Sequence, residues 1–138
     1  MPELTTTLAL IKPHAVQAGW TADIVNRYKS AGLKVCGTNP FTFSRAQAES
    51  FYVEHKGKPF FPGLIDAMCE GQTVAIILEG EDAVARVRDL NGATNPAKAK
   101  SGTIRADFKG EGGPYNTVHG SDSPEAAFRE ITLVFPQS

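Results

Sequence analysis

The run Val-Ala-Ile-Ile-Leu at residues 74–78 limits the possible folds more than any other feature of this chain. It is continuous in apolar side chains, yet it is far shorter than the roughly 20 apolar residues that a membrane-spanning helix needs. A short apolar run between polar residues is typical of a strand that is buried on both faces. The sequence therefore predicts such a strand over residues 73–79, inside a globular domain.

Apolar periodicity and end signals predict the remaining elements. Further strands are predicted over residues 6–12, 33–43 and 131–135. Helices are predicted over residues 21–31, 44–57, 63–70 and 82–90, and in a short segment after Ser123. Thr21 and Ser123 have side chains suited to an N-cap, Ser44 and Gln47 belong to a capping box, and Gly32 is expected to end its helix.

The order of these elements predicts an α+β fold. With the extra helices set aside, it is βαββαβ, the ferredoxin-like plan of four antiparallel strands with helices on one face. A long loop over residues 92–123, rich in Gly, Pro, Asn, Thr and Lys, interrupts this plan and contains His119 near its end. We expect one domain over residues 1–138, since this length is typical of one hydrophobic core.

Composition excludes several classes of function. Lys plus Arg is 14 and Asp plus Glu is 15, so the chain lacks the basic excess typical of nucleic-acid and membrane-surface binders. The N-terminal residues have no secretory signal pattern. Cys36 and Cys69 have no redox or metal-binding spacing. We expect both to be small buried side chains in a reducing compartment, and we place the protein in the cytoplasm.

One segment has the composition of an anion site, although neither a P-loop nor a G-x-G-x-x-G motif occurs. Four cations there stand near a single acid, Asp107: Lys98, Lys100, Arg105 and Lys109. Lys and Arg neutralise phosphate oxygens, so this cationic loop predicts phosphate chemistry.

His119 follows the cationic loop among small and polar residues. A neutral imidazole is a competent nucleophile at about pH 7, and its second N–H needs an acceptor, for which Glu130 is a candidate. The residues leave other interpretations open: His119 as a structural side chain, His119 as a metal ligand with Asp122, or a serine nucleophile at Ser121 or Ser123.

Several short blocks, spread from one end of the chain to the other, carry a resemblance. They are Leu-Ala-Leu-Ile-Lys-Pro at residues 8–13, Tyr-Val-Glu-His at 52–55, Lys-Pro-Phe-Phe at 58–61, Ala-Thr-Asn-Pro at 93–96, Gly-Thr-Ile-Arg-Ala-Asp-Phe at 102–108, Asn-Thr-Val-His-Gly-Ser-Asp-Ser at 116–123 and Arg-Glu-Ile at 129–131. The block at 116–123 is highly specific. With these blocks in this order, almost the whole chain resembles the nucleoside diphosphate kinase family.

The resemblance implies a ferredoxin-like core and transfer of the γ-phosphoryl group from a nucleoside triphosphate to a nucleoside diphosphate. His119 would take the group as phosphohistidine and pass it on in a ping-pong cycle. Glu130 would orient His119, Ser121 would support that contact, and Tyr52 would pack and hydrogen-bond beside the histidine. Family members also form homo-oligomers, so a dimer, tetramer or hexamer is implied.

The resemblance also implies how the nucleotide would be held. The phosphates would be bound by Lys12, Arg88, Thr94 and Arg105, the sugar by Lys12 and Asn116, and the base by Phe60 with help from Leu64. Mg²⁺ would be bound through the nucleotide phosphates, without a direct protein ligand. Taken singly, these residues have structural alternatives: Phe60 and Leu64 as core, Arg88 as a solvated charge, Lys12 as an edge residue and Tyr52 as helix packing.

Three residues depart from the family pattern. His14 stands where an acidic residue is usual, and its protonation would add positive charge near Lys12. Ser101 replaces a usual proline, and Pro62 is expected to shift the start of a helix. Two further functions are weighed: a binding or regulatory protein without useful turnover, and a ferredoxin-like nucleic-acid module, which the missing RNA-recognition aromatics disfavour.

Overall fold

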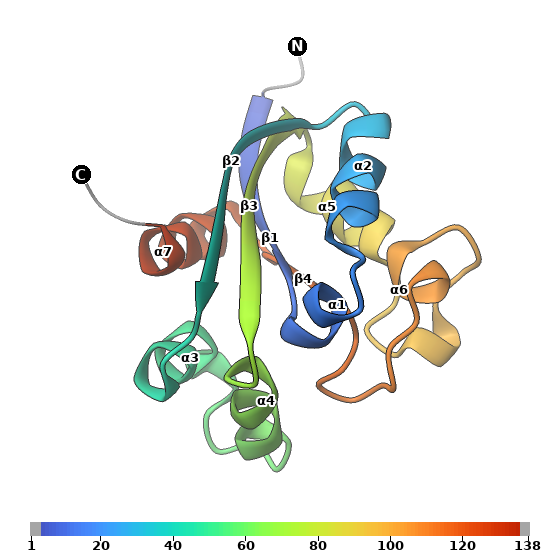
Figure 1. Ribbon diagram of the computed structural model, residues 1–138. Coiled ribbons are helices and arrows are strands. Elements are labelled where there is room, and N and C mark those ends of the chain that lie inside the picture. Colours follow the sequence, from blue (N-terminus) through green and yellow to red (C-terminus); the bar gives the residue numbers. More distant parts are fainter. Residues whose placement is uncertain (1–3, 136–138) are drawn as a thin grey trace.

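Four antiparallel strands form the centre of the structure, a computed structural model that describes residues 4–135 (Figure 1). The strands are β1 (Leu4–Ile11), β2 (Lys34–Thr42), β3 (Gln72–Glu81) and β4 (Val118–Gly120), in the sheet order β2-β3-β1-β4. β1 lies in the middle, pairing with β3 from Leu4↔Glu81 to Ile11↔Val74 and with β4 from Ala9↔Gly120 to Ile11↔Val118. The predicted α+β, ferredoxin-like arrangement is confirmed.

The helices connect these strands and pack around the sheet. They are α1 (Pro13–Gln17), α2 (Thr21–Ser30), α3 (Arg45–Phe51), α4 (Phe61–Met68), α5 (Ala83–Asn91), α6 (Ile104–Asp107) and α7 (Pro124–Val134), with 3₁₀ turns at Val53–His55 and Pro96–Lys98. The one domain predicted over residues 1–138 extends beyond the described residues at both ends and stays a prediction. Within residues 4–135, no helix is long and apolar enough to cross a membrane.

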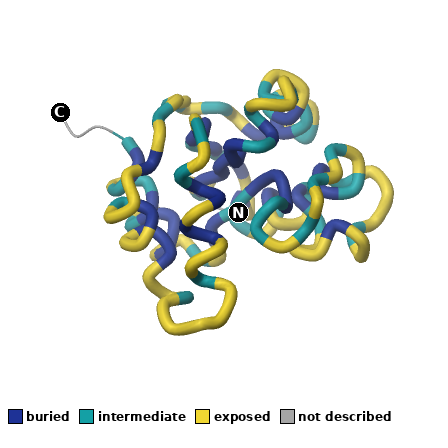
Figure 2. The backbone as a smooth tube through the Cα atoms, turned by 60° about the horizontal axis from the view of Figure 1, so that its bottom comes forward, coloured by how far each residue is buried: buried dark blue, intermediate teal, exposed yellow. Residues whose placement is uncertain are grey.

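Apolar side chains cover both faces of the sheet, which corrects the expectation of helices on one face. Along β1, Ala9 and Ile11 belong to the cluster that includes residues of α2 and α5, whereas Leu8 and Leu10 belong to the cluster with α3, α4 and α7. Successive side chains of a strand point to opposite faces, so a continuous apolar strand needs cover on both sides. α2 and α5 lie to one side of the sheet and α7 to the other (Figure 1), and buried segments fill the middle (Figure 2).

The strand predicted over residues 131–135 is wrong, because these residues continue α7 to Val134. Ser123 begins the helix as predicted, with its Oγ accepting the Ala126 N–H at 3.0 Å. The buried side chains Ala126, Ala127, Glu130 and Val134 recur at helical spacing. The fourth strand is β4, whose three residues are too few to produce a visible alternation in the sequence.

Smaller differences have local causes. Thr21 is the first residue of α2 rather than its cap, and Trp20 precedes it without a side-chain hydrogen bond. The helix predicted over residues 44–57 ends at Phe51, where Tyr52 leaves helical geometry. The loop predicted over residues 92–123 contains α6 and β4. Cys36 is exposed and Cys69 half-buried, since β2 is an edge strand and Cys69 directly follows α4, so the expectation of burial is wrong.

The Ser123 cap supplies a test of this fold. Replacing Ser123 with Ala leaves the Ala126 N–H without its acceptor, and we expect the free energy of unfolding to fall by about 1 kcal/mol in urea titrations. Ser123→Asp keeps an acceptor and should restore most of the loss. Ser44→Ala removes the equivalent cap of α3 and serves as a parallel test, with a similar loss of unfolding free energy expected. Unchanged stability of Ser123→Ala would contradict this account.

Candidate active site

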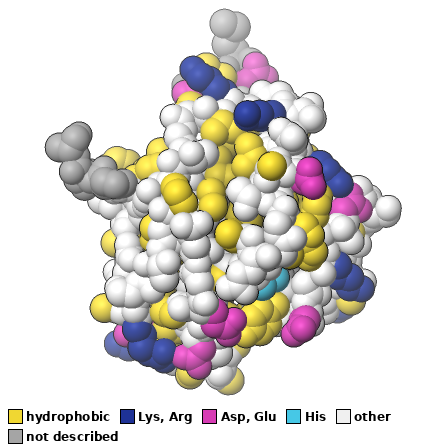
Figure 3. Space-filling model, viewed as in Figure 1, with side chains coloured by type: hydrophobic (Ala, Val, Ile, Leu, Met, Phe, Trp, Pro, Cys, Tyr) yellow, Lys and Arg dark blue, Asp and Glu magenta, His cyan; other side chains and the backbone are white. Residues whose placement is uncertain are grey.

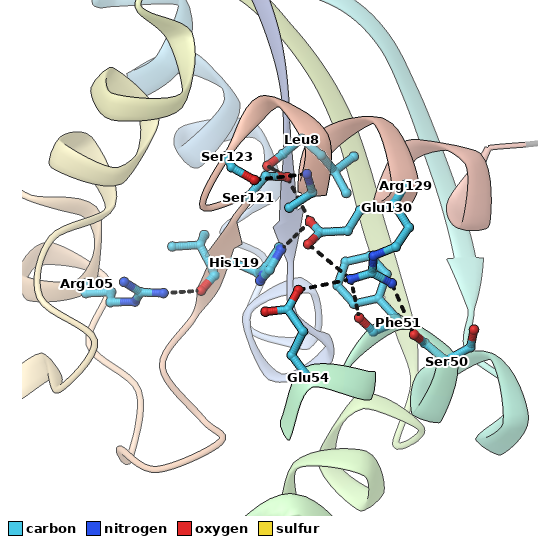
Figure 4. Close-up of polar contacts among 12 residues, drawn as sticks. Leu8, Ser50, Phe51, Glu54, Arg105, His119, Ser121, Ser123, Arg129 and Glu130 are labelled. Carbon is cyan, nitrogen blue, oxygen red and sulfur yellow. Dashed lines mark hydrogen bonds and ion pairs between the residues drawn. The ribbon is translucent and has the colours of Figure 1, made fainter. Parts of the chain in front are cut away.

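His119 lies in β4 opposite Leu10 of β1, and α7 folds back to bring Glu130 beside it. The His119 Nε2 and Glu130 Oε1 atoms are 2.8 Å apart, and Ser121 Oγ donates to the same carboxylate oxygen at 2.7 Å (Figure 4). Glu130 and Ser121 are buried, whereas the His119 side chain is 19% exposed. The structure thus places these three predicted site residues in one hydrogen-bonded group.

Arg129 supports this group and was not among the predicted site residues. Its Nη2 is 3.8 Å from Glu130 Oε2 and 3.6 Å from Glu54 Oε1, and its guanidinium donates to the carbonyl oxygens of Ser50 and Phe51 (Figure 4). Arg129 therefore fastens α7 to the end of α3, which fixes the position of Glu130. Its place directly before Glu130 was the available sequence signal.

The contact with Glu130 determines which ring nitrogen of His119 is reactive. Burial by itself would raise the pKa of Glu130, but the hydrogen bonds and charges of its neighbours His119, Ser121 and Arg129 together outweigh it, so the pKa of this carboxyl lies below its usual value. An ionised carboxylate only accepts hydrogen bonds. His119 must then carry its proton on Nε2, which leaves the lone pair of a neutral ring on Nδ1.

Aromatic rings form one wall around His119. The ring centroids of Phe51 and Tyr52 lie 5.1 Å and 5.8 Å from that of His119, both in edge-on orientations. Within the described residues, the buried hydroxyl of Tyr52 has no hydrogen-bond partner. Burial raises the pKa of Tyr52, so this hydroxyl stays protonated and can act as a donor beside the imidazole.

Two buried cations line the same cavity as His119. Lys12 follows β1, and its Nζ contacts Pro114 O at 3.3 Å. Arg105 of α6 donates to carbonyl oxygens at 2.6–3.0 Å; the acceptors are Gly92, Asn116 and Val118. Burial, together with the nearby Arg105, lowers the pKa of Lys12 to about 7. Burial also lowers the pKa of Arg105.

A cleft of about 790 Å³ joins His119, the aromatic wall and the two cations. The other predicted nucleotide-binding residues line this cleft as well: Phe60, Leu64, Arg88, Thr94 and Asn116. Phe60 is 52% exposed, so it is not a core residue, whereas Leu64 is buried and also belongs to the core. Arg88 is exposed on α5 at the edge of the cleft.

Asn116 connects the cleft to the loop after α5. Its Nδ2 donates to Thr94 O at 3.2 Å, and its buried Oδ1 has no partner among residues 4–135. A buried amide oxygen without a donor is unusual, because desolvation of a polar atom is costly. Asn116 is therefore prepared to accept a hydrogen bond from a ligand in the cleft.

Two other histidines are held by contacts with neighbouring residues. His14 accepts the Thr117 N–H on its Nε2 at 3.1 Å, and burial, followed by the charge of Lys12, lowers its pKa to about 4. His14 thus adds no positive charge at neutral pH. His55 lines the cleft between Tyr52 and Phe60, at ring-centroid distances of 6.3 Å and 5.3 Å.

The alternative interpretations of His119 find little support in this geometry. Within residues 4–135, no three His, Cys, Asp or Glu side chains gather as metal ligands, so His119 and Asp122 lack a third ligand there. The Ser121 hydroxyl donates to Glu130, and the Ser123 hydroxyl caps α7. An unprotonated imidazole nitrogen beside buried cations is suited to attack on a phosphoryl group.

The fold and the cleft together are those of a class of proteins that bind or transfer phosphate groups and are built on a ferredoxin-like sheet. A sequence model of the nucleoside diphosphate kinase family matches residues 5–138, and the chain belongs to this family. Nucleoside diphosphate kinases of Burkholderia mallei (strain SAVP1) and Burkholderia pseudomallei (strain K96243) are each 47% identical to it over 134 residues, which cover 97% of this chain and 94% of theirs. Its function is accordingly that of a nucleoside diphosphate kinase.

Solved structures agree with this assignment. The nucleoside diphosphate kinase of Aquifex aeolicus superposes with a TM-score of 0.92 at 37% identity, covering 97% of this chain and 96% of its own. A halophilic nucleoside diphosphate kinase from Halobacterium salinarum, solved in complex with CDP, has a TM-score of 0.92 at 39% identity, with 98% and 90% covered.

The lowered pKa of Lys12 predicts that nucleotide binding takes up a proton. Phosphates favour the charged amine, so binding should raise a pKa that stands at about 7 in the free protein. We expect the affinity for ADP to fall by up to about tenfold per pH unit between about pH 7 and 9. Calorimetry at about pH 8, in buffers of different ionisation enthalpy, measures the uptake.

Lys12→Gln should bind ADP more weakly and lose this pH dependence. Lys58→Gln is the matched control, because Lys58 is exposed and its Nζ lies 5.8 Å from the ring centroid of Phe60, which lines the cleft. It should keep the pH slope of the wild type. Proton uptake that is the same in wild type and Lys12→Gln would show that another group is responsible.

Proposed function

We propose that this kinase transfers the terminal phosphoryl group through a phosphohistidine at His119, in a ping-pong cycle. The observation that carries the proposal is the contact between His119 Nε2 and Glu130 Oε1 at 2.8 Å. It occupies one ring nitrogen with a carboxylate and leaves Nδ1 as the nucleophilic atom.

In the first half of the cycle, the Nδ1 lone pair attacks the γ-phosphorus, and the bond from phosphorus to the bridging oxygen breaks. The nucleoside diphosphate leaves with that electron pair, and the positive charge on the ring is stabilised by Glu130. In the second half, a terminal oxygen of another nucleoside diphosphate attacks the same phosphorus, and the nitrogen–phosphorus bond breaks. His119 returns to its neutral form, so no net proton is consumed.

The proposed phosphate contacts come from the cations and hydroxyls of the cleft. Phosphoryl transfer has a loose transition state whose charge is spread over the equatorial oxygens, so fixed cations supply most of the stabilisation. Lys12 and Arg105 are buried and have no carboxylate partner in residues 4–135, so their positive charge is unbalanced whenever they are protonated. The unpartnered Tyr52 hydroxyl would donate to the phosphoryl group on His119.

The remaining contacts would place the nucleoside. Phe60, exposed at the cleft, would stack on the base, with Leu64 behind it, and every base offers a π-face to such a ring. Asn116 and Lys12 would contact the sugar, while Arg88 and Thr94 would bind phosphate oxygens. This arrangement would accept purines and pyrimidines alike.

Mg²⁺ fits this donor set when it enters with the nucleotide. The side chains proposed to meet the phosphates are cations and neutral donors, so the oxygen ligands of the ion would be those of the nucleotide itself. Bound there, Mg²⁺ would neutralise phosphate charge during transfer. Because nucleoside phosphates are substrates of cytoplasmic metabolism, the proposal also places the enzyme in the cytoplasm.

Intact-mass analysis after incubation with ATP and Mg²⁺ tests the proposal. The wild type should gain a single acid-labile phosphoryl group, which disappears when a nucleoside diphosphate is added. His119→Ala should remain folded and gain none. His55→Ala is the matched control, because it removes the other imidazole of the cleft and should keep the adduct. An adduct on His119→Ala would refute the assignment of the nucleophile.

We also propose that the chain forms a homo-oligomer. Among the described strands, β2 pairs only with β3, so one of its edges is left open. Hydrophobic side chains gather on the face that carries β2, whereas charged ones lie mostly at its rim (Figure 3). Open edges and apolar patches of this kind are typical sites of subunit pairing.

Sedimentation tests the assembly directly. At micromolar concentration the wild type should sediment as a particle with at least double the mass of the 14.8 kDa chain. Thr38→Lys places a charge on exposed β2 and should shift the protein toward smaller species. Ala85→Lys, at an exposed position of α5, should leave the assembly intact. A wild type that sediments as a monomer would contradict the proposal.

A further inference from the structure

Thr117 adopts a backbone conformation that is rare for its residue type. Its φ is +77°, in the left-handed region that β-branched residues avoid, and its side chain is fully buried. Three hydrogen bonds hold it there. Its N–H donates to His14 Nε2 at 3.1 Å, its Oγ1 donates to Phe108 O at 2.6 Å, and its carbonyl accepts the Lys12 N–H at 3.0 Å.

The segment around this turn supplies carbonyl oxygens to both buried cations. Lys12 Nζ contacts Pro114 O, and Arg105 donates to Asn116 O and to Val118 O. These acceptors lie within three residues of Thr117, and His119 follows two residues later. The conformation of Thr117 therefore helps to determine where the cations and the nucleophile stand relative to one another.

His14 is itself held close to the turn. Its ring meets Tyr115 edge-on at a centroid distance of 5.5 Å, and the Tyr115 hydroxyl donates to Glu70 Oε1 at 2.6 Å. The chain at Gly110 also approaches closely, because a Cβ there would stand 2.9 Å from His14 Nε2 and 2.0 Å from Tyr115 O. The imidazole, which α1 carries, is thus confined against the loop before β4.

We propose that His14 is a positioning residue for phosphoryl transfer: by accepting the Thr117 N–H, it holds the left-handed turn that places the carbonyl partners of Lys12 and Arg105. The inference rests on the proposed function of the cleft, and His14 acts through Thr117 without touching the nucleotide. Only an unprotonated nitrogen can accept this N–H, so the role requires a neutral ring.

The surroundings of His14 favour that neutral ring. The charged or titratable groups facing it are Lys12 at the end of β1, Glu70 after α4 and Tyr115 in the loop. Burial and the charge of Lys12 lower the pKa of His14, and Glu70 opposes them in part. Protonation would remove the acceptor and add a positive charge beside Lys12, so the turn should loosen in acid.

Steady-state kinetics of three variants test the proposal. His14→Leu fills the space without an acceptor, and we expect its KM for ADP and ATP to rise by about tenfold, with a smaller change in kcat. His14→Gln offers a neutral carbonyl acceptor and should stay within about threefold of the wild type. Tyr115→Phe, the matched control, removes the hydroxyl contact with Glu70 but leaves the His14 acceptor, and should match the wild type.

Acid titration of ADP affinity supplies a second arm that does not require His14→Leu to fold. Below about pH 5, where His14 with its pKa of about 4 begins to take up a proton, the wild type should lose affinity more steeply than His14→Gln, because glutamine has no proton to gain. Titration of the nucleotide is common to both proteins and cancels in the comparison. A purely structural role would lower the thermal stability of a variant without separating these two profiles.

Two results would overturn the proposal: wild-type KM values in a folded His14→Leu, or superimposable acid profiles of wild type and His14→Gln. Phosphorylation of the wild type by ATP is measured alongside and tests the proposed function separately. If the wild type forms the phosphohistidine while the His14 variants behave like it, only the role of His14 fails. If the wild type forms none, the proposed function fails, and the role of His14 with it.

Discussion

The burial of two cations near each other is the constraint on which this site depends. Lys12 and Arg105 are 5% and 9% exposed, and their partners within residues 4–135 are backbone carbonyl oxygens rather than carboxylates. A buried charge without a counter-charge is costly, which is why burial lowers the pKa of both groups. A bound polyphosphate would supply the missing negative charge. The electrostatic cost in the free protein and the affinity for phosphates thus have the same origin.

The sheet brings the parts of the site together. Lys12 directly follows β1, β4 places His119 against β1, and α7 returns Glu130 to the imidazole. Arg129 connects α7 to the end of α3 by hydrogen bonds, and its guanidinium also lies beside the Glu130 carboxylate. The nucleophile therefore rests on the rigid part of the fold. Most carbonyl partners of the cations come from the more irregular chain before β4, and Val118 of β4 supplies one more.

The sequence predicted the long elements well and the short ones poorly. The apolar runs of β1 and β3, the periodicity of α2 and α5 and the Ser44 and Ser123 caps all have local signals, and the structure contains each of them. The error at residues 131–135 has a local cause too: Ile-Thr-Leu-Val-Phe is rich in strand-favouring side chains, yet packing of α7 on β1 keeps it helical to Val134. Three-residue β4 becomes a strand only because β1 offers it a partner.

The residue types of the site were readable from the sequence alone: a histidine among small polar residues, cations in the preceding loop and a glutamate downstream. Pattern and resemblance together sufficed for the family, the ferredoxin-like plan and a part of the residues that line the cleft. Only the tertiary structure decided which nitrogen of His119 faces Glu130, that Phe60 is exposed, and that His14 is a neutral acceptor for Thr117. These properties depend on burial and on contacts between residues up to 103 positions apart. Solvation and hydrogen-bond geometry over such separations exist only once the chain has folded.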